Sequence, residues 1–103
     1  MKKIVFSVLL TILSLSSFHC SAKETLAEAT KGKFLMGVAI NQQQVNGVNP
    51  IQTEQISHEF SAIVPENCMK PGPIHPEENK FYWDEADKFV AFGENNKQAV
   101  TGH

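Results

Sequence analysis

The chain has 103 residues, a formal net charge of −2 and 42% hydrophobic residues. A chain of this length has room for one small domain at most. It contains nine lysines and no arginine, and the lysines form no continuous stripe. This argues against nucleic-acid binding, which needs concentrated positive charge facing the phosphates.

Residues 1–22 have the pattern of a secretory signal peptide. Lys2 and Lys3 form a positively charged start, and the apolar stretch behind them is too short to span a bilayer as a stable helix. Cleavage at the small residues that follow would leave residues 23–103 as an exported chain, secreted or periplasmic. Lipidation of Cys20 is the alternative, and acyl chains would then anchor the protein to a membrane.

The first half of the exported chain predicts a short helix, a strand and a longer helix. Glu24–Thr30 has helical composition. The apolar run Phe34–Ile40 predicts a strand buried on both faces, because continuous apolar runs are typical of parallel sheets. After a polar segment, a helix is expected that Asn49 caps, Pro50 begins and His58 ends.

The second half continues this alternation. Ser61–Val64 is a short predicted strand, and Pro65 marks its end because proline cannot donate to a ladder. Three prolines and a glycine in Pro71–Pro76 predict an extended loop. At the end of the chain, Gln98–Gly102 begins a third strand.

A second long helix is expected between this loop and the third strand. Asp84 is its predicted cap, and Asn95 and Asn96 are its predicted stop. Its core-facing residues follow the i, i+3, i+4, i+7 spacing, and they are Ala86, Phe89, Val90 and Gly93. The alternating order implies parallel strands with right-handed crossovers, and eight such units close a (β/α)8 barrel.

Polar side chains gather where the predicted strands end. Glu66, Asn67 and Lys70 follow the second strand, and His103 follows the third. In a (β/α)8 barrel these carboxyl ends form the active site. A carboxylate, an amide, an ammonium and an imidazole around one cleft suit a polyhydroxylated ligand. Without further information, however, each residue is better explained as a solvated polar side chain of a loop.

Four segments add a family resemblance. They are GKFLMGVAIN (Gly32–Asn41), ENCMK (Glu66–Lys70), IHPEENKFYW (Ile74–Trp83) and ADKFVAFGENN (Ala86–Asn96), and TGH follows them. In this order and with these gaps they resemble the start of glycoside hydrolase family 10, the endo-1,4-β-xylanases. The resemblance implies an α/β fold in which residues 23–103 are the first two βα units and the third strand of an incomplete (β/α)8 TIM barrel.

The resemblance also implies roles for the polar residues. By match to the family motifs, Glu66, Asn67 and Lys70 would hydrogen-bond xylose hydroxyls on the glycone side of the cleft. His103 would contact the sugar beside the bond that is cut. The family usually has Trp after the lysine, and Pro71 here removes that aromatic side chain and stiffens the loop.

No catalytic residue is assigned to this chain. Retaining glycosidases need two carboxyl groups about 5–5.5 Å apart. In the family, these two glutamates belong to the fourth and seventh strands, beyond the end of this sequence. The resemblance therefore implies a fragment that is inactive without a downstream segment completing the barrel.

Two hypotheses follow. The first is the N-terminal fragment of a secreted endo-1,4-β-xylanase, with xylan or xylo-oligosaccharide as its ligand. The alternative is a small exported carbohydrate-binding or interaction protein without catalysis, which requires independent folding. We expect no cofactor and no metal, because the histidines show no metal-ligand spacing. Cys68 is expected to be a small core residue rather than a catalytic thiol, since no partner base is evident.

Overall fold

The computed structural model describes residues 21–102. Most of the predicted signal peptide, Cys20 included, and His103 therefore lie outside the described residues. Within the described residues, no helix is long and apolar enough to cross a membrane.

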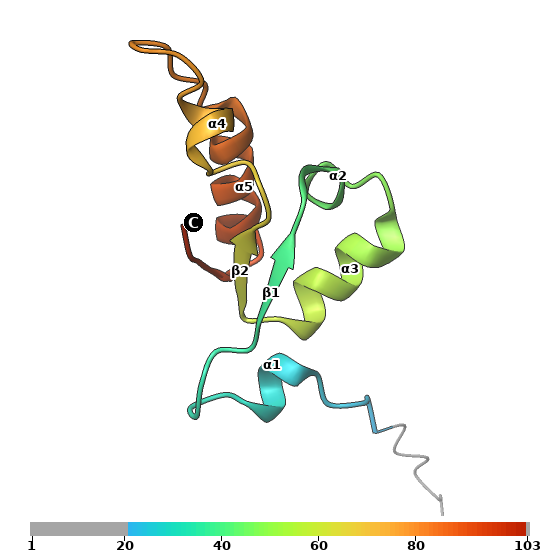
Figure 1. Ribbon diagram of the computed structural model, residues 1–103. Coiled ribbons are helices and arrows are strands. Elements are labelled where there is room, and N and C mark those ends of the chain that lie inside the picture. Colours follow the sequence, from blue (N-terminus) through green and yellow to red (C-terminus); the bar gives the residue numbers. More distant parts are fainter. Residues whose placement is uncertain (1–20, 103) are drawn as a thin grey trace, which may run out of the picture.

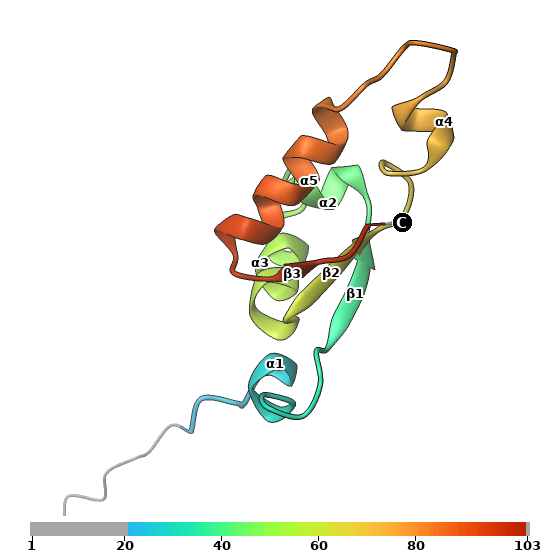
Figure 2. The same cartoon turned by 90° about the vertical axis from the view of Figure 1, so that its left-hand side faces the viewer.

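Three parallel strands form one small sheet in the order β1–β2–β3. Figure 1 labels the first two strands, and Figure 2 labels all three. The strands are β1 (Gly37–Ile40), β2 (Ala62–Pro65) and β3 (Ala99–Val100). The helices are α1 (Leu26–Ala29), α2 (Gln42–Val45), α3 (Pro50–Glu59), α4 (Pro71–Ile74) and α5 (Asp84–Asn95). This confirms the predicted alternation, with two crossover helices, α3 and α5, joining neighbouring parallel strands.

Both crossover helices pack on the same face of the sheet, as Figure 2 shows in side view. Ile40 of β1, Ile63 of β2, Ile56 of α3 and Phe89 of α5 form the buried cluster between the layers. Burying an aliphatic or aromatic side chain of this kind contributes about 1.5–3 kcal/mol. This cluster is the main apolar core of the described residues.

The other face of the sheet has no helix against it in residues 21–102 (Figure 2). Gly37 and Ala39 are exposed there, and Ala62 and Val64 are half-buried. The prediction of a first strand buried on both faces is thus wrong for the described part of the chain. The strand is also shorter than predicted, because β2 begins at Ala62, which pairs with Gly37.

The residues before β1 are correspondingly exposed. Phe34 and Leu35 precede the paired region and are 60% and 64% exposed. Two further apolar positions are also open to solvent. Ile51 is 78% exposed on α3, and Val90, a predicted core residue, is 36% exposed on α5. The sequence shows that these residues are apolar, but the packing of the helices on the sheet decides which of them are buried.

Helix starts follow local capping chemistry where a side chain can reach the backbone. The Asn49 side chain accepts hydrogen bonds from the amides of Ile51 and Gln52, as predicted for a cap. The prediction that Asp84 caps α5 is wrong. Trp83 precedes α5 in a helical conformation, so Asp84 is already inside the first turn, where its charge faces the positive helix end.

Two short helices were not predicted from the sequence. The predicted loop Pro71–Pro76 contains α4, because proline with its fixed φ suits the first position of a helix. The polar segment after β1 contains α2. There Asn41 and Gln44 form a reciprocal capping box, which satisfies two amides at the helix start.

The end of α5 leads directly into β3. Asn96 caps the helix, as predicted from the Asn95–Asn96 pair. The amide of Lys97 then donates to Glu94 O and that of Gln98 to Gly93 O, which closes the last turn. The buried Gln98 amide nitrogen donates to the carbonyls of Ile56 and Phe60, both at 2.9 Å. It thereby ties the end of α3 to β3.

Gly93 provides a test of the contact between α5 and the sheet. A Cβ at this position would collide with Val100 Cγ2 and lie 3.2 Å from Ile63 Cδ1. We therefore expect Gly93→Ala to destabilise the chain by about 1–3 kcal/mol through overpacking. The gain in helix propensity, about 1 kcal/mol, should only partly offset this.

Urea unfolding followed by circular dichroism measures the effect. Gly72→Ala is the matched control, since Gly72 also lies in a helix and a Cβ added to it would meet no atom within 4 Å. The control should be neutral or slightly stabilising. Equal effects of the two substitutions would contradict the close packing of α5 on β2 and β3.

Candidate functional site

The carboxyl end of β2 carries the predicted polar residues. Ile40 and Pro65 are register partners at the ends of β1 and β2. Pro65 has no amide hydrogen, but the ladder continues because the Glu66 amide donates to Ile40 O at 3.0 Å. The proline therefore ends the strand, as predicted, without misaligning the residue that follows. Glu66 is consequently held at the sheet edge directly beside the end of β1.

Asn67 and Lys70 form a turn next to Glu66. The Lys70 ammonium donates to Asn67 Oδ1 at 3.0 Å, and the Lys70 amide donates to Asn67 O at 3.0 Å. Pro71 disfavours a helical backbone at the preceding residue, and Lys70 indeed has an extended φ/ψ of −70°/155°. Pro71 thus helps to hold Lys70 in this turn. The structure brings Glu66, Asn67 and Lys70 to one edge, while His103 lies outside the described residues.

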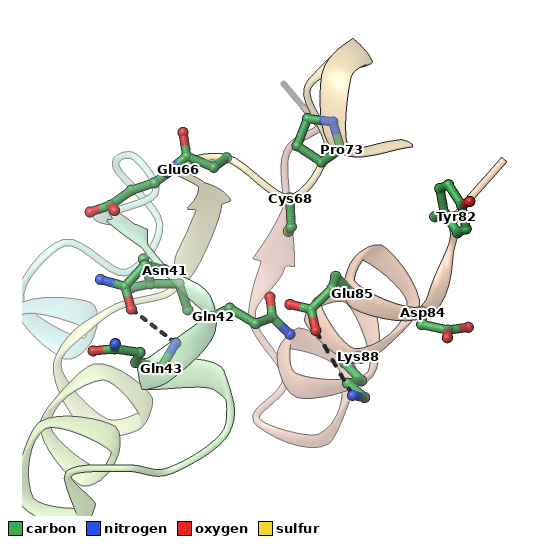
Figure 3. A pocket seen from close by; sticks show the side chains of 12 residues that line it. Asn41, Gln42, Gln43, Glu66, Cys68, Pro73, Tyr82, Asp84, Glu85 and Lys88 are labelled. Carbon is green, nitrogen blue, oxygen red and sulfur yellow. Dashed lines mark hydrogen bonds and ion pairs between the residues drawn. The ribbon is translucent and has the colours of Figure 1, made fainter. Parts of the chain in front are cut away.

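A pocket of about 750 Å³ adjoins this edge. It lies between α2 and the start of α5, beneath the loop that follows β2 (Figure 3). Its size is within the range of small-molecule sites in proteins. The polar residues that line it are Asn41, Gln42, Gln43, Glu66, Asn67, Tyr82, Asp84, Glu85 and Lys88. Lys70 does not line the pocket, so the two features share only Glu66 and Asn67.

The amide side chains after β1 differ in how they are used. Asn41 Oδ1 accepts from the amides of Gln43 and Gln44, and Gln44 Oε1 accepts from the Asn41 amide at 2.9 Å. These two side chains therefore stabilise α2. Gln42 has both of its amide atoms buried, and neither has a hydrogen-bond partner among the described residues. Figure 3 shows Gln42 projecting between Asn41 and Glu85.

An aromatic segment precedes α5 beside the pocket. His75, Phe81 and Trp83 stack, with nearly parallel rings and centroid distances of 4.2 Å and 5.5 Å between neighbours. Tyr82 lies between the last two in sequence, and it lines the pocket. Its amide donates to Ile74 O at 2.8 Å, which ties this segment to the end of α4.

The charge of the pocket limits its ligands. Three carboxylates line it, from Glu66, Asp84 and Glu85, against one ammonium, from Lys88, which lies 4.0 Å from Glu85. Excess negative charge disfavours phosphates and carboxylates as ligands. In residues 21–102, no group of three or more His, Cys, Asp or Glu side chains is arranged to hold a metal ion.

Cys68 also lines the pocket and packs against the apolar core. Burial is the main cause that raises the pKa of its thiol, and the nearby Glu85 carboxylate raises it further. A raised pKa leaves less thiolate at neutral pH, so the side chain has low nucleophilicity. Cys68 is half-buried, so it lies at the margin of the apolar core, and the predicted role as a small core residue is confirmed only in part.

These features were compared with known proteins. The family model for glycosyl hydrolase family 10 matches residues 25–103. The chain belongs to this family. Its three parallel strands and two crossover helices are thus the N-terminal part of the family 10 barrel, as the sequence predicted.

The relatives of this family 10 chain include proteins named as xylanases and one named as an exoglucanase. Endo-1,4-beta-xylanase A of Xylanibacter ruminicola is 36% identical over 96 residues, which cover 93% of this chain and 25% of that enzyme. Exoglucanase XynX of Acetivibrio thermocellus is 32% identical over 78 residues, which cover 76% of this chain and 7% of that protein. The chain therefore spans a quarter or less of these two relatives.

A solved structure supports the same assignment. A GH10 endoxylanase retrieved from a sugarcane soil metagenome superposes with a TM-score of 0.70 at 37% identity. The superposition covers 76% of this chain and 23% of that one. The chain thus matches a small part of a much longer fold in this neighbour.

The sequence did not identify Gln42 and Tyr82 as parts of a pocket. The Asn41-x-x-Gln44 spacing could have predicted the capping box, and with it the position of Gln42 at a helix start. Nothing in the sequence could show that the Gln42 amide is buried without a partner, because this depends on α5 lying opposite.

Cys68 reactivity tests the local packing. In a Cys20→Ser background Cys68 is the only thiol. We expect iodoacetamide to modify it more slowly at pH 8 than in the urea-unfolded chain, because partial burial limits both access and ionisation. Equal rates in the two states would contradict the packing of Cys68 against the core.

The raised pKa of Cys68 also predicts a pH effect. The unfolded thiol ionises first, near its ordinary pKa of 9.0. The folded state should therefore lose stability as the pH rises from about 9 through the higher folded pKa. Cys68→Ala should remove this part of the alkaline loss in urea unfolding, and an unchanged pH profile in the variant would contradict it.

Proposed function

We propose that this chain supplies the first part of an endo-1,4-β-xylanase that hydrolyses β-1,4-xylosidic bonds in xylan with retention. Membership of family 10 supports the proposal, and so does the 36% identity to the xylanase of Xylanibacter ruminicola. The substrate is proposed as xylan or xylo-oligosaccharide. An exoglucanase among the relatives makes a β-1,4-glucan the natural comparison substrate.

The observation that carries the proposal is the polar cluster at the end of β2. Asn67 Oδ1 accepts from Lys70, which leaves the Asn67 amide hydrogens and the other Lys70 ammonium hydrogens as donors. The neighbouring Glu66 carboxylate is an acceptor. Sugar hydroxyls both donate and accept, so Glu66, Asn67 and Lys70 together can bind one sugar residue. We propose that they form glycone-side contacts, with His103 contacting the sugar beside the bond that is cut.

We further propose that a downstream segment completes the barrel on the uncovered sheet face. That face forms a shallow groove of about 300 Å³, lined by strand residues and Thr101 without a charged side chain. An apolar sheet face with open edges is unfavourable in water. The superposed GH10 endoxylanase, of which this chain covers 23%, has the additional length that such a segment needs.

We propose export as the destination of the chain. The lysines at the start and the apolar stretch behind them support a signal peptide over residues 1–22. Cleavage would release the chain into the periplasm or the medium, whereas lipidation of Cys20 would keep it at a membrane.

A chimera tests the proposed activity. Residues 25–102 would replace the matching segment of Xylanibacter ruminicola endo-1,4-beta-xylanase A. We expect the chimera to release reducing sugar from xylan, and this chain by itself to release none. Lys70→Ala in the chimera should lower kcat/KM by about 10- to 100-fold, in line with about 1.5–3 kcal/mol for a hydrogen bond to a charged group.

Lys33→Ala is the matched control, because Lys33 is an exposed lysine on the amino-terminal side of β1. It should leave kcat/KM unchanged. A folded chimera that cleaves β-1,4-glucan but not xylan would refute the proposed substrate. An unchanged kcat/KM for Lys70→Ala would refute the proposed role of the lysine.

A further inference from the structure

The pair Asn46–Gly47 lies at the end of α2, where the chain turns toward α3. We propose that this pair is a site of spontaneous chemical modification, at which Asn46 deamidates through a cyclic succinimide and water converts the succinimide to aspartate and isoaspartate. The proposal concerns the stability of the chain itself and does not depend on the proposed function.

The first argument is that the fold leaves the Asn46 side chain unused. Four asparagine side chains take part in hydrogen bonds, namely those of Asn41, Asn49, Asn67 and Asn96. Three further asparagines of residues 21–102 are exposed and have no side-chain hydrogen bond within that range, namely Asn46, Asn79 and Asn95. Hydrogen bonds restrict the rotation that ring closure requires, so the reactive asparagine should belong to this second group.

The second argument is that Gly47 distinguishes Asn46 from the other two. Ring closure needs the backbone nitrogen of the next residue to reach the side-chain carbonyl carbon, and a side chain on that residue obstructs the approach. Lys80 and Asn96 follow the other two asparagines, whereas Gly47 has no side chain. A Cβ added to Gly47 would meet no atom within 4 Å, so the space around the pair is open as well.

The reaction needs only solvent. The Gly47 nitrogen gives up its proton and bonds to Asn46 Cγ, the bond from Cγ to Nδ2 breaks, and Nδ2 leaves as ammonia. Water then opens the cyclic imide at either carbonyl. Opening at Cγ gives aspartate with the ordinary backbone, and opening at the main-chain carbonyl gives isoaspartate, whose backbone runs through Cγ. No oxidant or reductant is involved, because no atom changes its oxidation state.

The hydrogen bonds at the end of α2 should slow the reaction without preventing it. The Gly47 amide donates to Gln44 O at 3.2 Å and the Val48 amide to Gln43 O at 3.0 Å, which is a Schellman motif. The first of these bonds must open before the Gly47 nitrogen can attack. Because α2 has only four residues, this local opening should cost little free energy.

Either product should weaken the end of α2. A carboxylate at the carboxyl end of a helix faces the negative end of the helix dipole. Isoaspartate also lengthens the backbone before Gly47, which moves the Gly47 and Val48 amides away from their acceptors. Gln44 O accepts from the Thr53 hydroxyl at 3.1 Å as well, so the change extends to α3. We therefore expect deamidation to lower the urea midpoint of the chain.

Peptide mapping by mass spectrometry tests the site after the intact chain is incubated in mildly alkaline buffer made with water enriched in heavy oxygen. Asn46 should gain heavy oxygen and separate into two products by chromatography, while Asn79 and Asn95 stay unmodified over the same period. Asn46→Gln is the matched control, because it keeps the amide and its longer side chain disfavours ring closure. Modification of Asn79 or Asn95 as fast as that of Asn46 would overturn the proposal.

A parallel incubation in urea measures the protection by α2. The reaction should be faster in urea and still detectable in the folded chain. Reaction in urea alone would overturn the proposal, because the site would then be closed in the folded state. Equal rates in both conditions would overturn the protection assigned to the end of α2.

The effect on stability is measured on the same samples. The urea midpoint of the incubated chain should fall, and by more than that of freshly prepared Asn46→Asp, which adds the charge without lengthening the backbone. Incubated Asn46→Gln should keep its midpoint. A modified chain with an unchanged midpoint would contradict the role of this turn in holding α2 against α3.

Discussion

The contact of Phe89 with Ile40 and Ile63 is the interaction on which the rest of the structure depends. Phe89 is fully buried, and the two isoleucines come from neighbouring strands. Their burial on one sheet face fixes α5 against both strands at once. Because β1 and β2 are parallel, it also brings their carboxyl ends to one edge. The polar residues that follow each strand are positioned by this apolar contact.

At that edge, some polar groups stabilise the fold through hydrogen bonds and others make no such bond. Pro65 ends the ladder, and the next amide, that of Glu66, completes it. Asn41 at the end of β1 is committed to the start of α2. The Glu66 carboxylate and the Gln42 amide have no such structural hydrogen bond among the described residues. The exposed Glu66 carboxylate is therefore available to a ligand, whereas the Gln42 amide atoms are buried although they have no partner.

Those features that depend on neighbouring residues were predicted well from the sequence. Asn49 and Pro50 start α3 through a local cap, and the Asn96 end of α5 is equally local. The resemblance to family 10 is confirmed by the match over residues 25–103. Prediction failed where the same residue is compatible with two different local conformations. Pro71 suits both a loop and a first helical turn, and Asp84 suits both a cap and the first turn inside a helix.

By itself, the sequence determined the order of strands and helices, the family, and the placement of Glu66, Asn67 and Lys70 after the second strand. Apolar runs, caps and motif spacing are properties of the chain that need no partner. Only the tertiary structure decided which apolar residues are covered and that Gln42 is buried opposite α5. Burial depends on which helix and sheet surfaces pack against each other, and residues distant in sequence determine that packing.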